Sequence, residues 1–100
     1  MQAHPYRYGG RPIEPNLVHG YEINCSAGDL PYADKIVEVG KERGKFIVCG
    51  TDYHGSNPFF GGTYLPKDIQ TSVDLANYLR KTPKTTVFLE DKEIEITTKN

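Results

Sequence analysis

The stretch FIVCGTDYHG, residues 46–55, decides the fold because an unbroken apolar run leads directly into polar residues between glycines. A short apolar run bounded by turn residues is typical of a parallel strand that is buried on both faces. In sheets of parallel strands, residues that contact ligands follow the carboxyl ends of the strands. We therefore expect residues 46–49 to form an interior strand, with a candidate site in residues 50–55.

The residues before this strand predict another strand and a helix. Residues 21–25 favour a short β-strand. Asp29 is suited to cap the start of a helix, and Gly44 suits the position just after its end. Between them, small and apolar residues recur at the spacing of one helix face, at Ala33, Ile36, Val37 and Gly40. The pattern predicts a strand–helix–strand unit with parallel strands.

The last third of the chain predicts a second helix and a hairpin. Thr71 and Asp74 have the spacing of a helix capping box, and the helix that follows should end before Pro83. Two β-favouring runs then flank a short polar turn. We expect them to form a terminal β-hairpin over residues 85–98.

Two segments rich in glycine and proline, residues 5–20 and 55–66, are expected to be loops. Loops of this length are uncommon in compact domains unless they carry a function or lack order. The length of 100 residues predicts a single α/β domain across residues 1–100.

Composition excludes some classes of function. The 12 basic and 13 acidic residues leave a formal net charge of -1, so there is no strong signal for nucleic-acid binding, which needs a basic face. No apolar run reaches the about 20 residues needed to cross a bilayer, so we expect no membrane partner. Cys25 and Cys49 lie in apolar runs and lack the close spacing of a metal-binding pair. We expect reduced, buried thiols and a cytoplasmic protein.

The first candidate ligands are Asp52 and His54. They lie two residues apart, so in extended backbone their side chains point the same way. A carboxylate oxygen and an imidazole nitrogen suit Zn²⁺ or Mn²⁺. The alternative is a surface turn in which Asp52 bonds to the local backbone.

A second candidate group lies near the N-terminus. His4 precedes Pro5, which disfavours helix and should hold His4 in extended backbone, where Arg7 is close enough to contact a phosphate. The alternative is an exposed histidine and a solvated arginine. Glu22 and Asn24 share one side of their strand, where they either support metal ligands or simply face solvent.

Together these motifs resemble the PHP family, the polymerase and histidinol phosphatase domains. The resemblance rests on four elements in the same order, namely Ala3-His4-Pro5 with Arg7, Gly20 to Asn24, the helix around Ala33 and Ile36, and Gly50 to Gly55. It implies a partial PHP-type (β/α) barrel, with parallel strands, helices and the C-terminal hairpin. It also implies phosphoester hydrolysis by water that a cluster of divalent metals (Zn, Mn or Fe) activates.

By position in the family pattern, His4, Asp52 and His54 match metal ligands, and Arg7 matches a residue that faces the substrate phosphate. Glu22 matches a recurrent acidic position without an assigned role. The substrate of the complete domain would be a phosphorylated small molecule or a nucleotide.

The sequence departs from the family because no H-x-H pair precedes His4. The resemblance therefore covers the C-terminal part of the domain, and we expect this chain alone to be inactive. A second copy of the chain or a missing N-terminal half would be the partner. The alternative function is a non-catalytic metal-binding or interaction module derived from a PHP domain.

Overall fold

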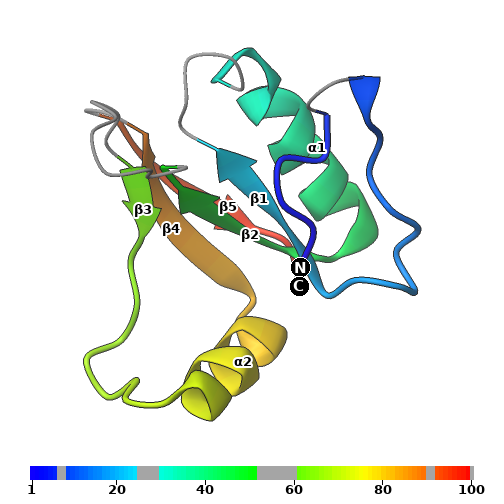
Figure 1. Cartoon of the computed structure of the whole chain (residues 1–100). Coiled ribbons are helices and arrows are strands. Elements are labelled where there is room, and N and C mark those ends of the chain that lie inside the picture. The colour runs from blue at the N-terminus through cyan, green and yellow to red at the C-terminus, as the bar shows by residue number, and fades with distance from the viewer. Residues whose placement is uncertain (7–8, 25–29, 52–60, 90–91, 100) are drawn as a thin grey trace.

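The computed structural model describes residues 1–6, 9–24, 30–51, 61–89 and 92–99. In chain order the elements are β1 (Gly20–Asn24), the 3-10 turn η2 (Leu30–Tyr32), α1 (Ala33–Arg43), β2 (Phe46–Gly50), β3 (Gly61–Thr63), α2 (Ser72–Lys81), β4 (Lys84–Leu89) and β5 (Lys92–Thr97). The strands form two sheets, the parallel pair β1–β2 and the antiparallel order β3–β4–β5 (Figure 1). Neither described helix is long and apolar enough to cross a membrane.

The predicted strand–helix–strand unit is confirmed. Strands β1 and β2 pair in parallel, with Tyr21 opposite Ile47. The helix α1 between them buries Ala33, Ile36 and Gly40, which belong to the apolar face expected from the sequence. It ends at Gly44, whose φ of 65° is left-handed and therefore favours glycine. The expected cap at Asp29 lies outside the described residues.

Helix α2 and the terminal hairpin also agree with the sequence. Thr71 accepts a hydrogen bond from the backbone N–H of Asp74 at 3.0 Å, so it caps α2 as predicted. Strands β4 and β5 pair along their length, from Lys84 opposite Thr97 to Leu89 opposite Lys92. The short strand β3 was missed, because its residues lie in the glycine-rich segment that was expected to be a loop.

The two sheets meet at the edge of β2 that faces away from β1. There the hydroxyl of Thr63 in β3 accepts from the Cys49 backbone N–H at 2.8 Å and donates to the Cys49 carbonyl at 3.4 Å. The hydroxyl of Thr85 in β4 donates to the Ile47 carbonyl at 2.6 Å. Threonine side chains of the antiparallel sheet therefore satisfy backbone groups that another parallel strand would otherwise pair with.

The expected partial PHP-type barrel is wrong. In a barrel, each parallel strand is paired along both edges, and the strands close on themselves. Among the described residues, the parallel sheet contains only β1 and β2, and the strands that follow form a separate antiparallel sheet. Because Thr63 and Thr85 occupy the outer edge of β2, the structure is a small α/β domain with two sheets and no closed barrel.

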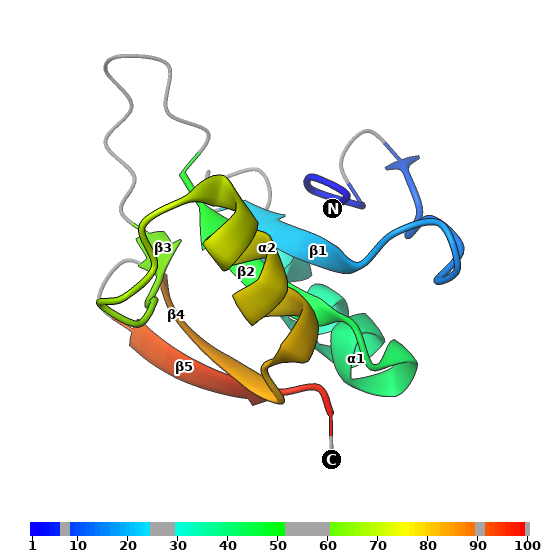
Figure 2. The ribbon, with the colours of Figure 1, turned by 90° about the horizontal axis from the view of Figure 1, so that it is seen from below.

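The parallel pair has two differently packed faces. On the core face, Tyr21, Ile23, Ile47 and Cys49 are buried and pack with α1 and with Val87 and Ile96 of the hairpin. On the opposite face, which we call the α2 face, Asn24 and Phe46 are buried, but Glu22, Val48 and Gly50 between and beside them are only half-buried. The helices α1 and α2 lie on opposite sides of the pair, as two views at right angles show (Figure 1, Figure 2). The expectation that residues 46–49 are buried on both faces is thus confirmed except at Val48.

Candidate functional site

The N-terminal segment is hydrogen-bonded to the edge of β1. The backbone N–H of Gln2 donates to the Gly20 carbonyl, and the N–H of Glu22 donates to the Gln2 carbonyl, both at 3.0 Å. Gln2 and Tyr21 form a parallel bridge, so the segment runs in the same direction as β1. His4, two residues later, therefore lies toward the carboxyl ends of the parallel strands.

Side chains hold the loop around this segment as well. The Gln2 amide donates to the Arg11 carbonyl at 3.0 Å and accepts from the Ile13 N–H at 2.7 Å. The buried Tyr21 hydroxyl donates to the Ile13 carbonyl at 2.8 Å, and the Arg43 guanidinium donates to that hydroxyl at 3.0 Å. The bond to Tyr21 is the largest cause that raises the pKa of Arg43 above its ordinary value. Residues of the loop are thus tied to β1 and to the end of α1.

The Glu22 carboxylate joins the two candidate motifs. One oxygen, Oε1, accepts from the His4 backbone N–H at 3.3 Å. The other, Oε2, lies 2.5 Å from the place where a Cβ on Gly50 would stand. The absence of a side chain at Gly50 therefore makes room for this carboxylate against the last residue of β2. One carboxylate contacts Ala3-His4-Pro5 on one side and the residues leading into Asp52 on the other.

His4 has an unusual backbone conformation. Its φ is 29°, whereas Pro5, which follows it, predicted extended backbone at His4. That expectation is wrong. A non-glycine residue with such a φ has a strained backbone, which persists only where the surrounding structure enforces it. Strained residues of this kind cluster at functional sites. Here the hydrogen bond to Glu22 and the bonds of Gln2 provide that enforcement. The side chain of His4 is half-buried.

Glu22 and Asn24 share one side of β1, as the alternation predicted. Asn24 is only 2% exposed, so the alternative that it simply faces solvent is wrong. Glu22 is half-buried and its carboxylate contacts the N-terminal segment. Full exposure to solvent is thus excluded for Asn24, and the supporting role of both residues beside metal ligands stays a prediction.

The remaining predicted site residues, Arg7, Asp52 and His54, lie outside the described residues. Within the described ranges, no three histidine, cysteine, aspartate or glutamate side chains converge on a point that suits a metal ion. In the described part of the candidate site, the Glu22 carboxylate contacts the backbone of His4. His19, the third histidine of the chain, is exposed and precedes β1, at the opposite end of the strands.

An aromatic pair with a cation follows His4, and sequence reasoning missed it. The rings of Tyr6 and Tyr32 stack with centroids 6.0 Å apart and planes inclined by 24°. The Lys35 ammonium lies 5.5 Å from the Tyr6 ring centroid and 5.9 Å from that of Tyr32, which is within the range of cation–π attraction. The sequence offered only Tyr6, two residues after His4, as an indication of this group. No local pattern indicates that Tyr6 contacts Tyr32.

Comparisons of the chain with protein-family models, with curated proteins and with solved structures gave no match. The case for a function therefore rests on the residues themselves and on their arrangement.

Proposed function

We propose that this chain contributes His4, Asp52 and His54 to a divalent-metal site of the kind that hydrolyses phosphoesters, and that the chain alone binds metal without turnover. The single observation that carries the proposal is the position of the Glu22 carboxylate. It contacts the His4 backbone and lies against Gly50, two residues before Asp52. The segment of His4 and the residue Gly50, more than forty residues apart in sequence, thus lie at the same end of the parallel strands.

The described residues fit a metal in part. The His4 imidazole is a donor that Zn²⁺, Mn²⁺ and Fe²⁺ accept, and His4 is half-buried rather than fully solvated. A complete site needs further donors, which Asp52 and His54 would supply. A bound divalent metal would contribute Lewis acidity and activate a water toward phosphorus.

The residues of this chain have separate roles in the proposal. Glu22 holds the His4 segment in place through the backbone N–H, which makes it a positioning residue. Arg7 offers a planar fork of donors to the phosphate of a phosphorylated small molecule or nucleotide. The remaining ligands would come from a missing N-terminal half or from a second copy of the chain. We place the chain in a reducing, cytoplasmic setting, in keeping with the burial of Cys49 in the core.

The test is a titration of the chelator-stripped chain with Zn²⁺ and with Mn²⁺, followed by NMR of the imidazole resonances. We expect the resonances of His4 and His54 to shift together and saturably, with His19 unaffected. His4→Ala and His54→Ala should each weaken metal binding by about tenfold or more, since each removes a ligand. His19→Ala is the matched control, because His19 lies at the other end of the strands.

Two further substitutions test the link through Glu22. Gly50→Ala places a Cβ against Oε2 and should displace the carboxylate, and Glu22→Gln removes its charge. Both should weaken metal binding with little loss of folding. Metal affinity that is equal in the wild type and in His54→Ala would overturn the proposal.

A second candidate, a non-catalytic metal-binding module, is favoured by the number of donors. Among the described residues no three histidine, cysteine, aspartate or glutamate side chains converge, whereas a metal cluster needs more donors than that. Binding of inorganic phosphate by the metal-loaded chain separates the two functions, because neither predicts turnover by this chain alone. Phosphate affinity that falls in Arg7→Ala would favour the phosphoesterase site, and saturable metal binding without phosphate binding would favour the module.

A further inference from the structure

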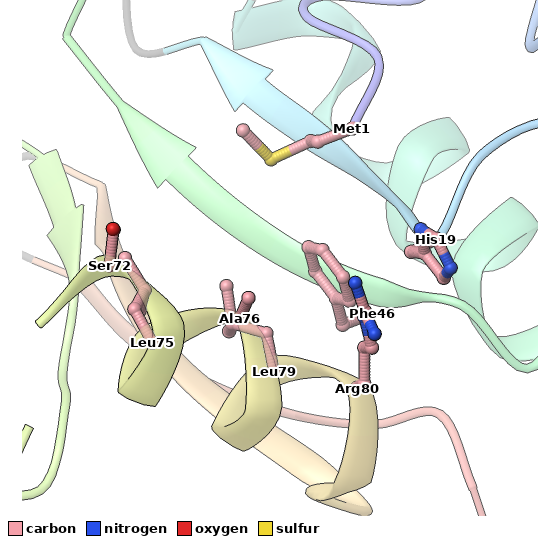
Figure 3. Close-up of a pocket in the computed structure, with 8 residues that line it drawn as sticks. All are labelled: Met1, His19, Phe46, Ser72, Leu75, Ala76, Leu79 and Arg80. Carbon is pink, nitrogen blue, oxygen red and sulfur yellow. The ribbon is translucent and has the colours of Figure 1, made fainter.

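A pocket of about 250 Å³ lies between α2 and the α2 face of the parallel pair (Figure 3). Its floor is the ring of Phe46, the first residue of β2. Its other wall is the inner side of α2, formed by Leu75, Ala76 and Leu79. The sulfur of Met1 points toward the space from the side of β1 (Figure 3). The pocket is thus at the amino ends of the strands, whereas His4 and Glu22 lie toward the carboxyl ends.

The lining is apolar with basic groups at one end. The side chains of His19 and Arg80 lie near the Phe46 ring, while Ser72 lies at the far end of α2 (Figure 3). Arg80 is always charged, and an imidazole ring offers at least one N–H donor whether or not it is protonated. None of the residues that line the pocket is acidic. The electrostatic complement of this end of the pocket is an anion.

Helix α2 is held in place without closing the pocket. Of its residues only Leu79 is buried, and Leu75 and Ala76 remain half-exposed. The start of the helix is fixed by the Thr71 cap, and its end by a hydrogen bond from the Lys99 ammonium to the Arg80 carbonyl. The backbone groups at both ends of α2 thus have partners, and the pocket lies between its apolar side and Phe46.

We propose that this pocket binds an aromatic monocarboxylate, with its ring between Phe46 and Leu79 and its carboxylate on Arg80 and His19. The volume exceeds that of an engineered cavity of about 150 Å³ that holds benzene, so one ring with a short acidic arm fits. An aromatic ring gains more than an alkyl chain here, because Phe46 offers ring stacking and Met1 a sulfur–aromatic contact. The guanidinium of Arg80 matches a carboxylate with two parallel donors.

The test is an NMR titration of the full chain with 3-phenylpropionate, alongside its neutral analogue 3-phenylpropanamide. We expect the acid to shift the backbone amides of α2 and of the start of β2, and to leave those near Glu22 unchanged. The acid should bind about tenfold more tightly than the amide, because only the acid pairs with Arg80. No metal is added, so this result does not depend on the proposed metal site.

Two variants separate the parts of the proposal. Arg80→Gln should remove the preference for the acid and leave binding of the amide unchanged. Ala76→Phe fills the pocket and should abolish binding of both probes. Lys81→Gln is the matched control, since Lys81 is a neighbouring exposed cation of α2 that does not line the pocket.

Three results would overturn the inference. The first is no saturable shift with either probe. The second is equal binding of acid and amide by the wild type, which would mean that Arg80 and His19 take no part. The third is a dimer in light scattering whose α2 amides are protected and which neither probe dissociates, since a second copy would then cover the pocket.

Discussion

The two faces of the β1–β2 pair differ in how completely their side chains are buried. On the core face, Tyr21, Ile23 and Ile47 are completely buried, and the hydroxyl of Tyr21 is satisfied by the Ile13 carbonyl. On the α2 face, Glu22 and Val48 are half-buried, and a pocket remains beneath α2. Free energy of folding should therefore come mainly from the core face, because burial of apolar surface is the dominant favourable contribution.

The difference in burial determines which face of so small a domain can hold a charged side chain. A carboxylate such as that of Glu22 is tolerated on the α2 face because that face is not fully sealed. The same carboxylate among Ile23, Ile47 and Ile36 would lose its hydration without compensation. Both proposed sites use the α2 face, one at each end of the strands.

The largest expected effect is on the core face. Ile47→Ala should lower the free energy of unfolding by about 3 kcal/mol, because it leaves a cavity beneath α1 where the side chain is completely buried. Val48→Ala is the matched change on the α2 face, and it should cost less than about 1 kcal/mol because Val48 is already half-exposed. Urea denaturation followed by circular dichroism measures both.

Equal losses in these two variants would contradict the division between the faces. Such a result would mean that the α2 face is as tightly packed as the core face, and the pocket beneath α2 would then have closed in solution.

A smaller effect is expected where the two sheets meet. Thr85→Val keeps the shape of the side chain but removes the donor to the buried Ile47 carbonyl, so stability should fall by about 1 to 2 kcal/mol. Thr86→Val, one residue along β4 and half-buried, is the control and should change stability little. A loss in Thr85→Val no larger than in Thr86→Val would show that the hydroxyl contributes nothing to the junction.

Local patterns were enough to predict α1, α2, the parallel pair and the hairpin. Each depends on neighbours in sequence, such as the periodicity of Ala33, Ile36 and Gly40 or the capping of α2 by Thr71. These signals act on one segment at a time, and at these elements the surrounding fold agrees with them.

The barrel and the site depend on contacts between distant segments, and there the sequence was less informative. Nothing in the local pattern of Thr63 or Thr85 indicates that their hydroxyls occupy the edge of β2. The left-handed backbone of His4 and its bond to Glu22 likewise join residues far apart in sequence. The family resemblance supplied candidate residues, but the barrel it implied was wrong. Asp52 and His54 remain predictions.

The smallest effect is expected in α2, where it tests whether the two faces unfold separately. Thr71→Ala removes the cap that accepts from Asp74, which should cost about 1 kcal/mol of local helix stability. Because α2 buries only Leu79, this loss should appear as faster amide hydrogen exchange in α2, by roughly fivefold, with β1 and β2 unchanged. Ser72→Ala, at the neighbouring exposed position, is the control.

The pattern of exchange decides the interpretation of this experiment. If α2 alone loses protection, the helix opens independently and the pocket beneath it is accessible without unfolding of the core. If β1 and β2 lose protection to the same extent, α2 folds together with the core face, and the α2 face carries part of the stability that we assign to the other side. In that case a ligand in the pocket would stabilise the whole domain, and 3-phenylpropionate would raise its midpoint in urea.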